Sequence, residues 1–91
     1  MIVANDITDL IGKTPMVRIN KLTVPMDAKI YAKLEWYNIG GSVKDRIALY
    51  ILNKAEKEGK LRKEKTILEA TSGNTGVALA MLAAVKGYKI T

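Results

Sequence analysis

Cysteine and histidine are both absent from this sequence of 91 residues. Without cysteine, neither a disulfide framework nor a thiolate metal site can form. Without histidine, the commonest metal ligand and the usual general base near neutral pH are also missing. The sequence therefore predicts no metal site, and it leaves serine, threonine, lysine and the carboxylates to carry any chemistry.

A long hydrophobic run is missing as well. The longest run reaches only from Val77 to Val85, whereas a helix needs about 20 apolar residues to span a bilayer. The start of the chain, MIVANDITDL, lacks the basic region and apolar stretch of a signal peptide. We therefore expect a soluble cytoplasmic protein with no membrane partner.

Positive charge is in excess, because 15 basic and 9 acidic residues give a net charge of +6. Such an excess raises the question of a nucleic-acid partner. Much of it lies in residues 54–65 (KAEKEGKLRKEK), where both signs alternate and no aromatic residue occurs. This pattern favours a solvated helix end and loop over a binding patch for nucleic acid or an acidic partner. We expect no nucleic-acid partner.

Alternating apolar and polar residues predict two N-terminal strands, over residues 16–19 and 29–34. Val24-Pro25 interrupts the pattern between them, and Asp27 is expected to open a turn. On the second strand, the predicted apolar face consists of Ile30, Ala32 and Leu34.

A helix is predicted to begin at Ser42, with Asp45 completing a variant of the capping box. Gly59 is a natural residue to end this helix. Its predicted apolar stripe consists of Ile47, Tyr50, Ile51 and Ala55.

In the C-terminal third, the sequence predicts a buried strand at 66–68 followed by a turn at 71–76. A helix is expected over residues 77–86, ending at Gly87, and a further strand from residue 88. Strands that alternate with helices are typical of an α/β fold with a parallel sheet. The second predicted helix is apolar on nearly all sides and should be buried in a complete fold. We therefore expect the chain to be the front part of a longer protein.

Lys44 is one candidate for chemistry. It lies in the first turn of the predicted helix, after the flexible pair Gly40-Gly41 and close to Arg46. The helix dipole and the neighbouring cation both favour a neutral amine, which is the form that attacks a carbonyl group in Schiff-base chemistry. The alternative is an ordinary surface lysine neutralised by Asp45.

The turn at 71–76 (TSGNTG) is the second candidate. Hydroxyls, an amide and free backbone N–H groups gather there at a helix N-terminus and at the carboxyl end of a strand, a place suited to a carboxylate or phosphate. It is neither a P-loop nor a dinucleotide fingerprint. The alternative is a simple capped turn, with Thr71 or Ser72 satisfying helix N–H groups.

Three motifs together resemble one known family. Residues 33–46 (KLEWYNIGGSVKDR) resemble the cofactor-lysine segment of the cysteine synthase and cystathionine β-synthase family, which are pyridoxal-phosphate enzymes of fold type II. Residues 69–76 (EATSGNTG) are similar to its substrate loop, and residues 11–17 (IGKTPMV) to its N-terminal signature. The resemblance covers the whole chain. It implies an α/β fold of the tryptophan synthase β-like type, built from parallel βαβ units.

The resemblance also implies roles for individual residues. Lys44 would bond covalently to pyridoxal 5′-phosphate and later remove the substrate α-proton, and Asn74 would hydrogen-bond the cofactor ring oxygen. The substrate carboxylate would be bound by Thr71, Ser72, Gly73, Asn74 and Thr75. The family usually has proline where this chain has Ile39, a departure that loosens the loop at a cost of about 0.4–1 kcal/mol.

The activity implied is replacement of an activated β-substituent on serine, making cysteine from O-acetylserine or O-phosphoserine and sulfide. The sequence at 71–75 argues against serine and threonine dehydratases, whose loop usually reads differently. Residues 1–36 would pack on a large domain not contained in this chain, and residues 37–91 would begin the small cofactor and substrate domain. A complementing C-terminal polypeptide or a homodimer is then a candidate partner. The alternative is a catalytically inactive chain that acts only by associating with a partner or full-length relative.

Overall fold

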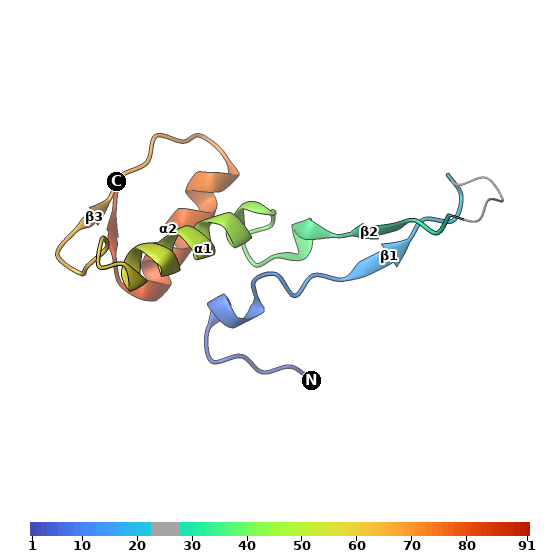
Figure 1. The fold of residues 1–91 in the computed structure, drawn as a ribbon, viewed down its shortest axis with the longest axis horizontal. Coiled ribbons are helices and arrows are strands. Elements are labelled where there is room, and N and C mark those ends of the chain that lie inside the picture. The colour runs from blue at the N-terminus through green and yellow to red at the C-terminus, as the bar shows by residue number, and fades with distance from the viewer. Residues whose placement is uncertain (23–27) are drawn as a thin grey trace.

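The computed structural model describes residues 1–22 and 28–91. The predicted break at Val24-Pro25 and turn at Asp27 lie outside these described residues. In chain order, the elements are η1 (Ile7–Leu10), β1 (Met16–Arg18), β2 (Tyr31–Lys33), η2 (Glu35–Tyr37), α1 (Lys44–Lys57), β3 (Thr66–Ile67), α2 (Asn74–Lys86) and β4 (Lys89–Ile90) (Figure 1).

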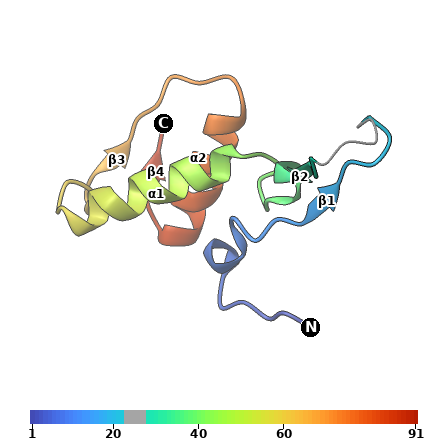
Figure 2. The same ribbon diagram turned by 45° about the vertical axis from the view of Figure 1, so that its right-hand side comes forward.

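The molecule is elongated, with extents of 57 × 33 × 22 Å. The two helices lie together at one end, and the β1–β2 ribbon projects from the other (Figures 1 and 2). The radius of gyration is 16.7 Å, against about 12 Å for a compact domain of this length. The accessible surface is 6809 Å², against about 5,200 Å² for a compact protein of this mass. The chain thus leaves open much surface that a complete domain covers.

The projecting ribbon confirms the two predicted N-terminal strands. β1 and β2 pair antiparallel, with Val17 opposite Ala32. All three residues of β1 are exposed, and only Ala32 of β2 is half-buried. The ribbon therefore has strand geometry but covers little apolar surface of its own.

The helical end confirms the predicted α/β class with parallel strands. β3 and β4 pair parallel, with Ile67 opposite Ile90, and α2 connects them. α1 packs against α2 and makes the core with it. The core consists of Ala48, Leu52, Ala78, Leu79 and Leu82. Its small alanines allow the two helices to approach closely.

The predicted apolar stripe of α1 is wrong in three of its four members, which are exposed, whereas the fourth, Ala55, is half-buried. Ile51 is 54% exposed, whereas its neighbour Leu52 is only 4% exposed. Ile47 and Tyr50 are also exposed, while Ala48 is buried. Apolar residues recur every four positions on both faces of this helix, so periodicity alone could not tell which face would meet α2.

The predicted burial of residues 66–68 is also wrong. β3 ends at Ile67, which is half-buried, and Leu68 is 78% exposed. Within the described residues, β3 pairs with β4 alone. In a sheet of only two described strands, β3 has too few neighbours to bury the side chain of Leu68.

The second helix is confirmed and starts three residues before its predicted beginning, at Asn74. One side of it is buried by α1, but Val77 and Val85 on other sides remain exposed. Gly87 ends the helix in the left-handed conformation (φ +79°), as Gly59 does after α1 (φ +73°). Among the described residues, no helix is both long and apolar enough to cross a bilayer.

Candidate functional site

Lys44 lies in the first turn of α1, as the sequence predicted, but the helix begins at Lys44 itself, two residues after the predicted start at Ser42. The chain reaches it through a tight turn in which the Gly41 N–H donates to the Asn38 carbonyl at 2.8 Å. Gly41 has a φ of +85°, which a side-chain-bearing residue rarely adopts. Ser42 Oγ accepts a hydrogen bond from the Lys44 N–H at 3.1 Å. The loop thus delivers Lys44 directly into the first helical turn.

Asp45 differs from the predicted capping box. Its carboxylate accepts from the Gly40 N–H at 2.5 Å instead of reaching back to Ser42, and the residue preceding the helix is Val43. Asp45 is fully buried, and its Oδ1 has no hydrogen-bond partner among the described residues. A Cβ at Gly40 would overlap this carboxylate. Asp45 therefore holds the glycine loop, and within the described chain it forms no ion pair with Lys44.

A second carboxylate holds α1 from the opposite side. The Arg46 guanidinium donates to Glu35 Oε2 at 2.6 Å and to Oε1 at 2.9 Å. The same guanidinium donates to the Gly12 carbonyl at 2.8 Å. A Cβ at Gly12 would lie 2.9 Å from the guanidinium, so only glycine allows this approach.

Two further side chains complete what we call the Glu35 network, which consists of Gly12, Thr14, Glu35, Asn38 and Arg46. Thr14 donates its hydroxyl to Glu35 Oε1 at 2.7 Å. Asn38 donates to Glu35 Oε2 at 2.9 Å and accepts from the Gly12 N–H at 2.8 Å. The hydrogen bonds from Arg46 and then Thr14 lower the pKa of Glu35 to about 2. The network joins the motif at residues 11–17 to the motif at residues 33–46. Local sequence patterns did not predict these contacts.

The loop at 71–73 lies beside the start of α2. Thr71 Oγ1 accepts from the Gly73 N–H at 3.3 Å, so this hydroxyl stabilises the loop itself. The residue before α2 is Gly73, and among the described residues no side-chain hydrogen bond caps this helix start, which differs from the capped-turn interpretation. A Cβ at Gly76 would approach the Thr71 methyl group to 2.5 Å, whereas one at Gly73 would have no atom of the described residues within 4 Å. The N-terminal end of α2 is thus open to a ligand with negative charge.

A hollow of about 230 Å³ lies between the start of α1, the end of β3 and the start of α2; we call it the Lys44 hollow. It brings together Lys44 and Thr75, from the two loops that the sequence singled out. Thr71, Ser72, Gly73 and Asn74 are exposed and do not line it. Its other lining residues are Glu69 and the apolar Ile47, Ala48, Ile51, Leu52, Ile67, Leu68 and Leu79.

Glu69 is a lining residue that sequence reasoning missed as a site residue. It is the only acidic residue of the Lys44 hollow among the described residues, and it stands just after β3. Its position after a strand and two residues before the TSGNTG turn is the signal that could have identified it.

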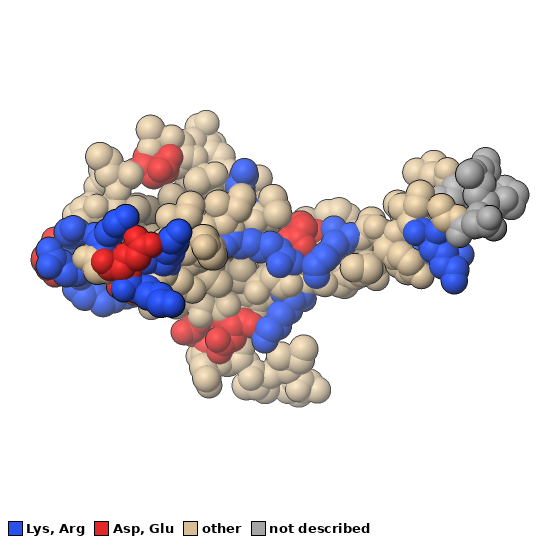
Figure 3. All heavy atoms as spheres, viewed as in Figure 1, with Lys and Arg blue, Asp and Glu red and all other residues tan. Residues whose placement is uncertain are grey.

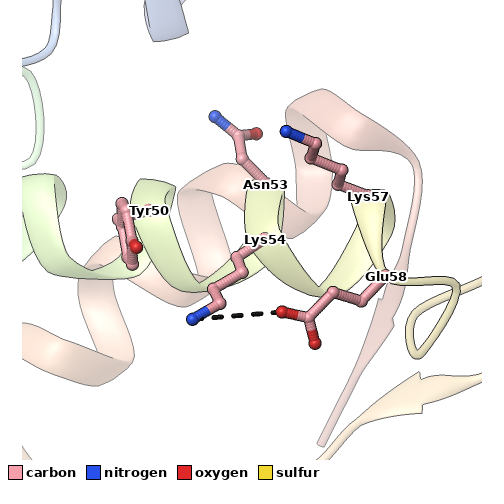
Figure 4. Close-up of a pocket in the computed structure, with 5 residues that line it drawn as sticks. All are labelled: Tyr50, Asn53, Lys54, Lys57 and Glu58. Atoms are coloured by element: carbon pink, nitrogen blue, oxygen red, sulfur yellow. Dashed lines mark ion pairs between the residues drawn. The ribbon is translucent and has the colours of Figure 1, made fainter.

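A wider hollow of about 560 Å³ lies elsewhere, along the exposed face of α1 (Figure 4). All of its lining residues belong to α1 or its end, and they include Lys54 and Glu58, whose charged groups are 3.9 Å apart. It contains none of the predicted site residues. Because one helix face alone forms it, we do not take it as the functional site.

The basic segment 54–65 lies at the end of the molecule where α1 finishes (Figure 3). Acidic side chains are interspersed with the basic ones there. Glu58 lies 3.0 Å from Lys60, and Glu64 lies 3.0 Å from Arg62. These pairs are those of a solvated surface with mixed charge.

Comparison with known proteins shows which family of enzymes this chain resembles. Residues 7–91 match the family of pyridoxal-phosphate dependent enzymes. Cysteine synthase from Staphylococcus aureus (strain Mu50) is 53% identical over 85 residues, which is 93% of this chain and 27% of that protein. Cystathionine beta-synthase from Dictyostelium discoideum is 47% identical over 89 residues, which is 98% of this chain and 18% of that protein.

Solved structures agree in fold. A hydrogen sulfide-producing enzyme from Fusobacterium nucleatum superimposes with a TM-score of 0.88 at 53% identity, covering 99% of this chain and 30% of that one. The O-acetylserine dependent cystathionine beta-synthase of Helicobacter pylori gives 0.86 at 41% identity, with the same coverage. The chain belongs to the pyridoxal-phosphate dependent enzymes of fold type II, in the family of cysteine synthase and cystathionine β-synthase.

Proposed function

We propose that this chain provides the lysine and the carboxylate-binding loop of an enzyme that makes cysteine from an activated serine, O-acetylserine or O-phosphoserine, and sulfide. The observation that carries the proposal is the Lys44 hollow, which Lys44 and Thr75 line together. It opens at the carboxyl end of β3, where α/β folds bind their ligands. Proteins to which this chain is similar include a cysteine synthase, at 53% identity, and an O-acetylserine dependent cystathionine beta-synthase, at 41%.

The residues present fit pyridoxal phosphate. A primary amine stands in the Lys44 hollow, and the uncapped start of α2 offers N–H groups beside Asn74. We assign Lys44 to hold the cofactor covalently and Asn74 to hydrogen-bond its ring oxygen. When bound, the cofactor supplies an electron sink for charge that develops at the substrate α-carbon. Once released from the cofactor, the Lys44 amine would be the base that takes the α-proton.

The substrate carboxylate is assigned to the loop at the start of α2, whose residues are Thr71, Ser72, Gly73, Asn74 and Thr75. These residues offer hydroxyls, an amide and N–H groups at the positive end of a helix dipole. The hydrogen bond from the Gly73 N–H to Thr71 gives the loop a defined shape before substrate binds. Binding at this point would orient the α-carbon towards Lys44.

Residues outside this chain complete the site in our proposal. The chain spans 27% of the length of the cysteine synthase it matches. Among the described residues of 1–36, Thr14 alone is buried. This exposure supports the idea that residues 1–36 pack on a large domain, while residues 37–91 begin the small one. A C-terminal polypeptide or a second copy of the chain are the candidate partners.

A reconstitution experiment tests the proposed activity. The chain is mixed with pyridoxal phosphate, O-acetylserine or O-phosphoserine, sulfide, and the part of Staphylococcus aureus cysteine synthase that follows its matched 85 residues. We expect cysteine to form, Lys44→Ala to abolish it, and Lys57→Ala on the same helix to leave it unchanged. The matched segment of the Staphylococcus aureus enzyme serves as the positive control. Cysteine from that control but not from this chain would favour an inactive chain that only associates with partners.

A further inference from the structure

We propose that Glu35 is a positioning residue that acts through Arg46 and sets the direction in which Lys44 leaves α1. The inference rests on the proposed function of Lys44. Glu35 does not line the Lys44 hollow, so any effect of it on the lysine must pass through the helix. No chemical step is assigned to Glu35 itself.

The helical geometry explains how the effect is transmitted. Lys44 and Arg46 are two residues apart, so they point to nearly opposite sides of α1. Lys44 lines the hollow, and Arg46 reaches the Glu35 network on the other side. Each residue turns a helix by about 100°. Fixing the direction of Arg46 therefore fixes the direction of Lys44.

The other restraints on the start of α1 are local in the described part of the chain. Ser42 Oγ accepts from the Lys44 N–H and Asp45 holds the Gly40 loop, while the buried apolar residues of this helix begin at Ala48, one turn after Lys44. Glu35 accepts hydrogen bonds from Arg46, Thr14 and Asn38, so its own carboxylate is held in place. A fork of two hydrogen bonds between a carboxylate and a guanidinium restrains orientation as well as distance.

The far end of α1 contains a matched control. Glu56 accepts from Lys86 Nζ at 2.7 Å and from Tyr88 Oη at 2.6 Å, so it also joins α1 to another part of the chain. It stands 12 positions after Lys44, a distance of about 18 Å along a helix. Loss of either carboxylate removes a comparable tertiary contact, but only Glu35 is coupled to the direction of Lys44.

The test compares Glu35→Gln with Glu56→Gln. Each variant of the whole chain is treated with pyridoxal phosphate, reduced with borohydride at timed intervals and mapped by mass spectrometry. Helical circular dichroism and the midpoint of thermal unfolding are recorded in parallel. We expect Glu35→Gln to slow labelling of Lys44 by about tenfold relative to the other lysines, because small misplacements of a reacting group are costly. Glu56→Gln should lower the unfolding midpoint yet leave the relative labelling of Lys44 within about twofold.

Each outcome has a defined meaning. Unchanged labelling of Lys44 in Glu35→Gln, or an equal loss in both variants, overturns the positioning role and leaves the proposed function intact. Unselective labelling in the unsubstituted chain overturns both. If Glu35→Gln loses its helical signal, Arg46→Lys replaces it and is judged by the same criteria. That variant keeps the positive charge but loses the fork of two hydrogen bonds to Glu35.

Discussion

Arg46 binds both carboxylate oxygens of Glu35, at 2.6 and 2.9 Å, and so joins the first turn of α1 to a residue that lies outside the helix. The same guanidinium reaches the Gly12 carbonyl, 34 positions earlier in the chain. The Arg46 guanidinium thus links three parts of the chain: the N-terminal motif through Gly12, the η2 turn through Glu35, and the start of the helix that carries Lys44.

This ion pair should make stability fall in acid. The pKa of Glu35 is lowered from its usual 4.5 to about 2 by hydrogen bonds from Arg46 and Thr14. A carboxylate whose pKa is lowered by folding stabilises the fold fully above 4.5, and this contribution is lost as the pH falls towards 2. We expect the difference in unfolding free energy between the unsubstituted chain and Glu35→Gln to be constant above pH 4.5 and to shrink below it.

Urea unfolding of both proteins across the acid range measures this difference. Subtraction is needed because hydrogen bonds also lower the pKa values of Asp6 and Glu56. These groups titrate in both proteins and cancel. A difference that stays the same down to pH 2 would contradict the assigned ion pair.

Gly40→Ala should destabilise the loop before Lys44. The added Cβ would overlap the buried Asp45 carboxylate, which already binds the Gly40 N–H. Overpacking of this kind costs about 1–3 kcal/mol. Gly73→Ala is the control, because no atom in residues 1–22 and 28–91 lies within 4 Å of the added Cβ and the φ of −137° is accessible to alanine. Equal unfolding free energies for the two variants would argue against this position of Asp45.

Two neighbouring residues of α1 test which face of the helix meets the core. Leu52 is buried against α2, whereas Ile51 is exposed. We expect Leu52→Ala to lose about 2–5 kcal/mol of unfolding free energy, as large-to-small substitutions in a core do. Ile51→Ala should change it by at most about 0.5 kcal/mol. Chemical denaturation of both variants checks this, and the reverse order would restore the stripe predicted from the sequence.

Local features of the sequence predicted much of the fold. The glycines that end both helices, the place of Lys44 in the first turn of α1 and the parallel strand class follow from local patterns over a few residues. The exposed face of α1 could not be predicted in this way. Ile47 and Ile51 have the same spacing as Ala48 and Leu52, and the choice between them depends on the contact with α2.

The sequence likewise predicted one part of the candidate site but not the other. Lys44 and the 71–75 loop were found by composition and position, since each lies at the start of a helix. The Glu35 network could not be predicted from local patterns, because its members come from two separate segments, residues 12–14 and 35–46, that meet only in the folded chain. Glu35 and Arg46 are 11 positions apart and belong to different elements. Their pairing depends on the tertiary path of the chain.

The most direct measurement maps the lysine that reacts with pyridoxal phosphate. The chain is mixed with the cofactor, its visible absorbance is recorded, and borohydride reduction is followed by peptide mass spectrometry. We predict a label concentrated on Lys44, which disappears in Lys44→Ala and persists in Lys57→Ala. A label scattered over many lysines and unchanged in Lys44→Ala would contradict the assignment of Lys44 as the cofactor lysine of this chain.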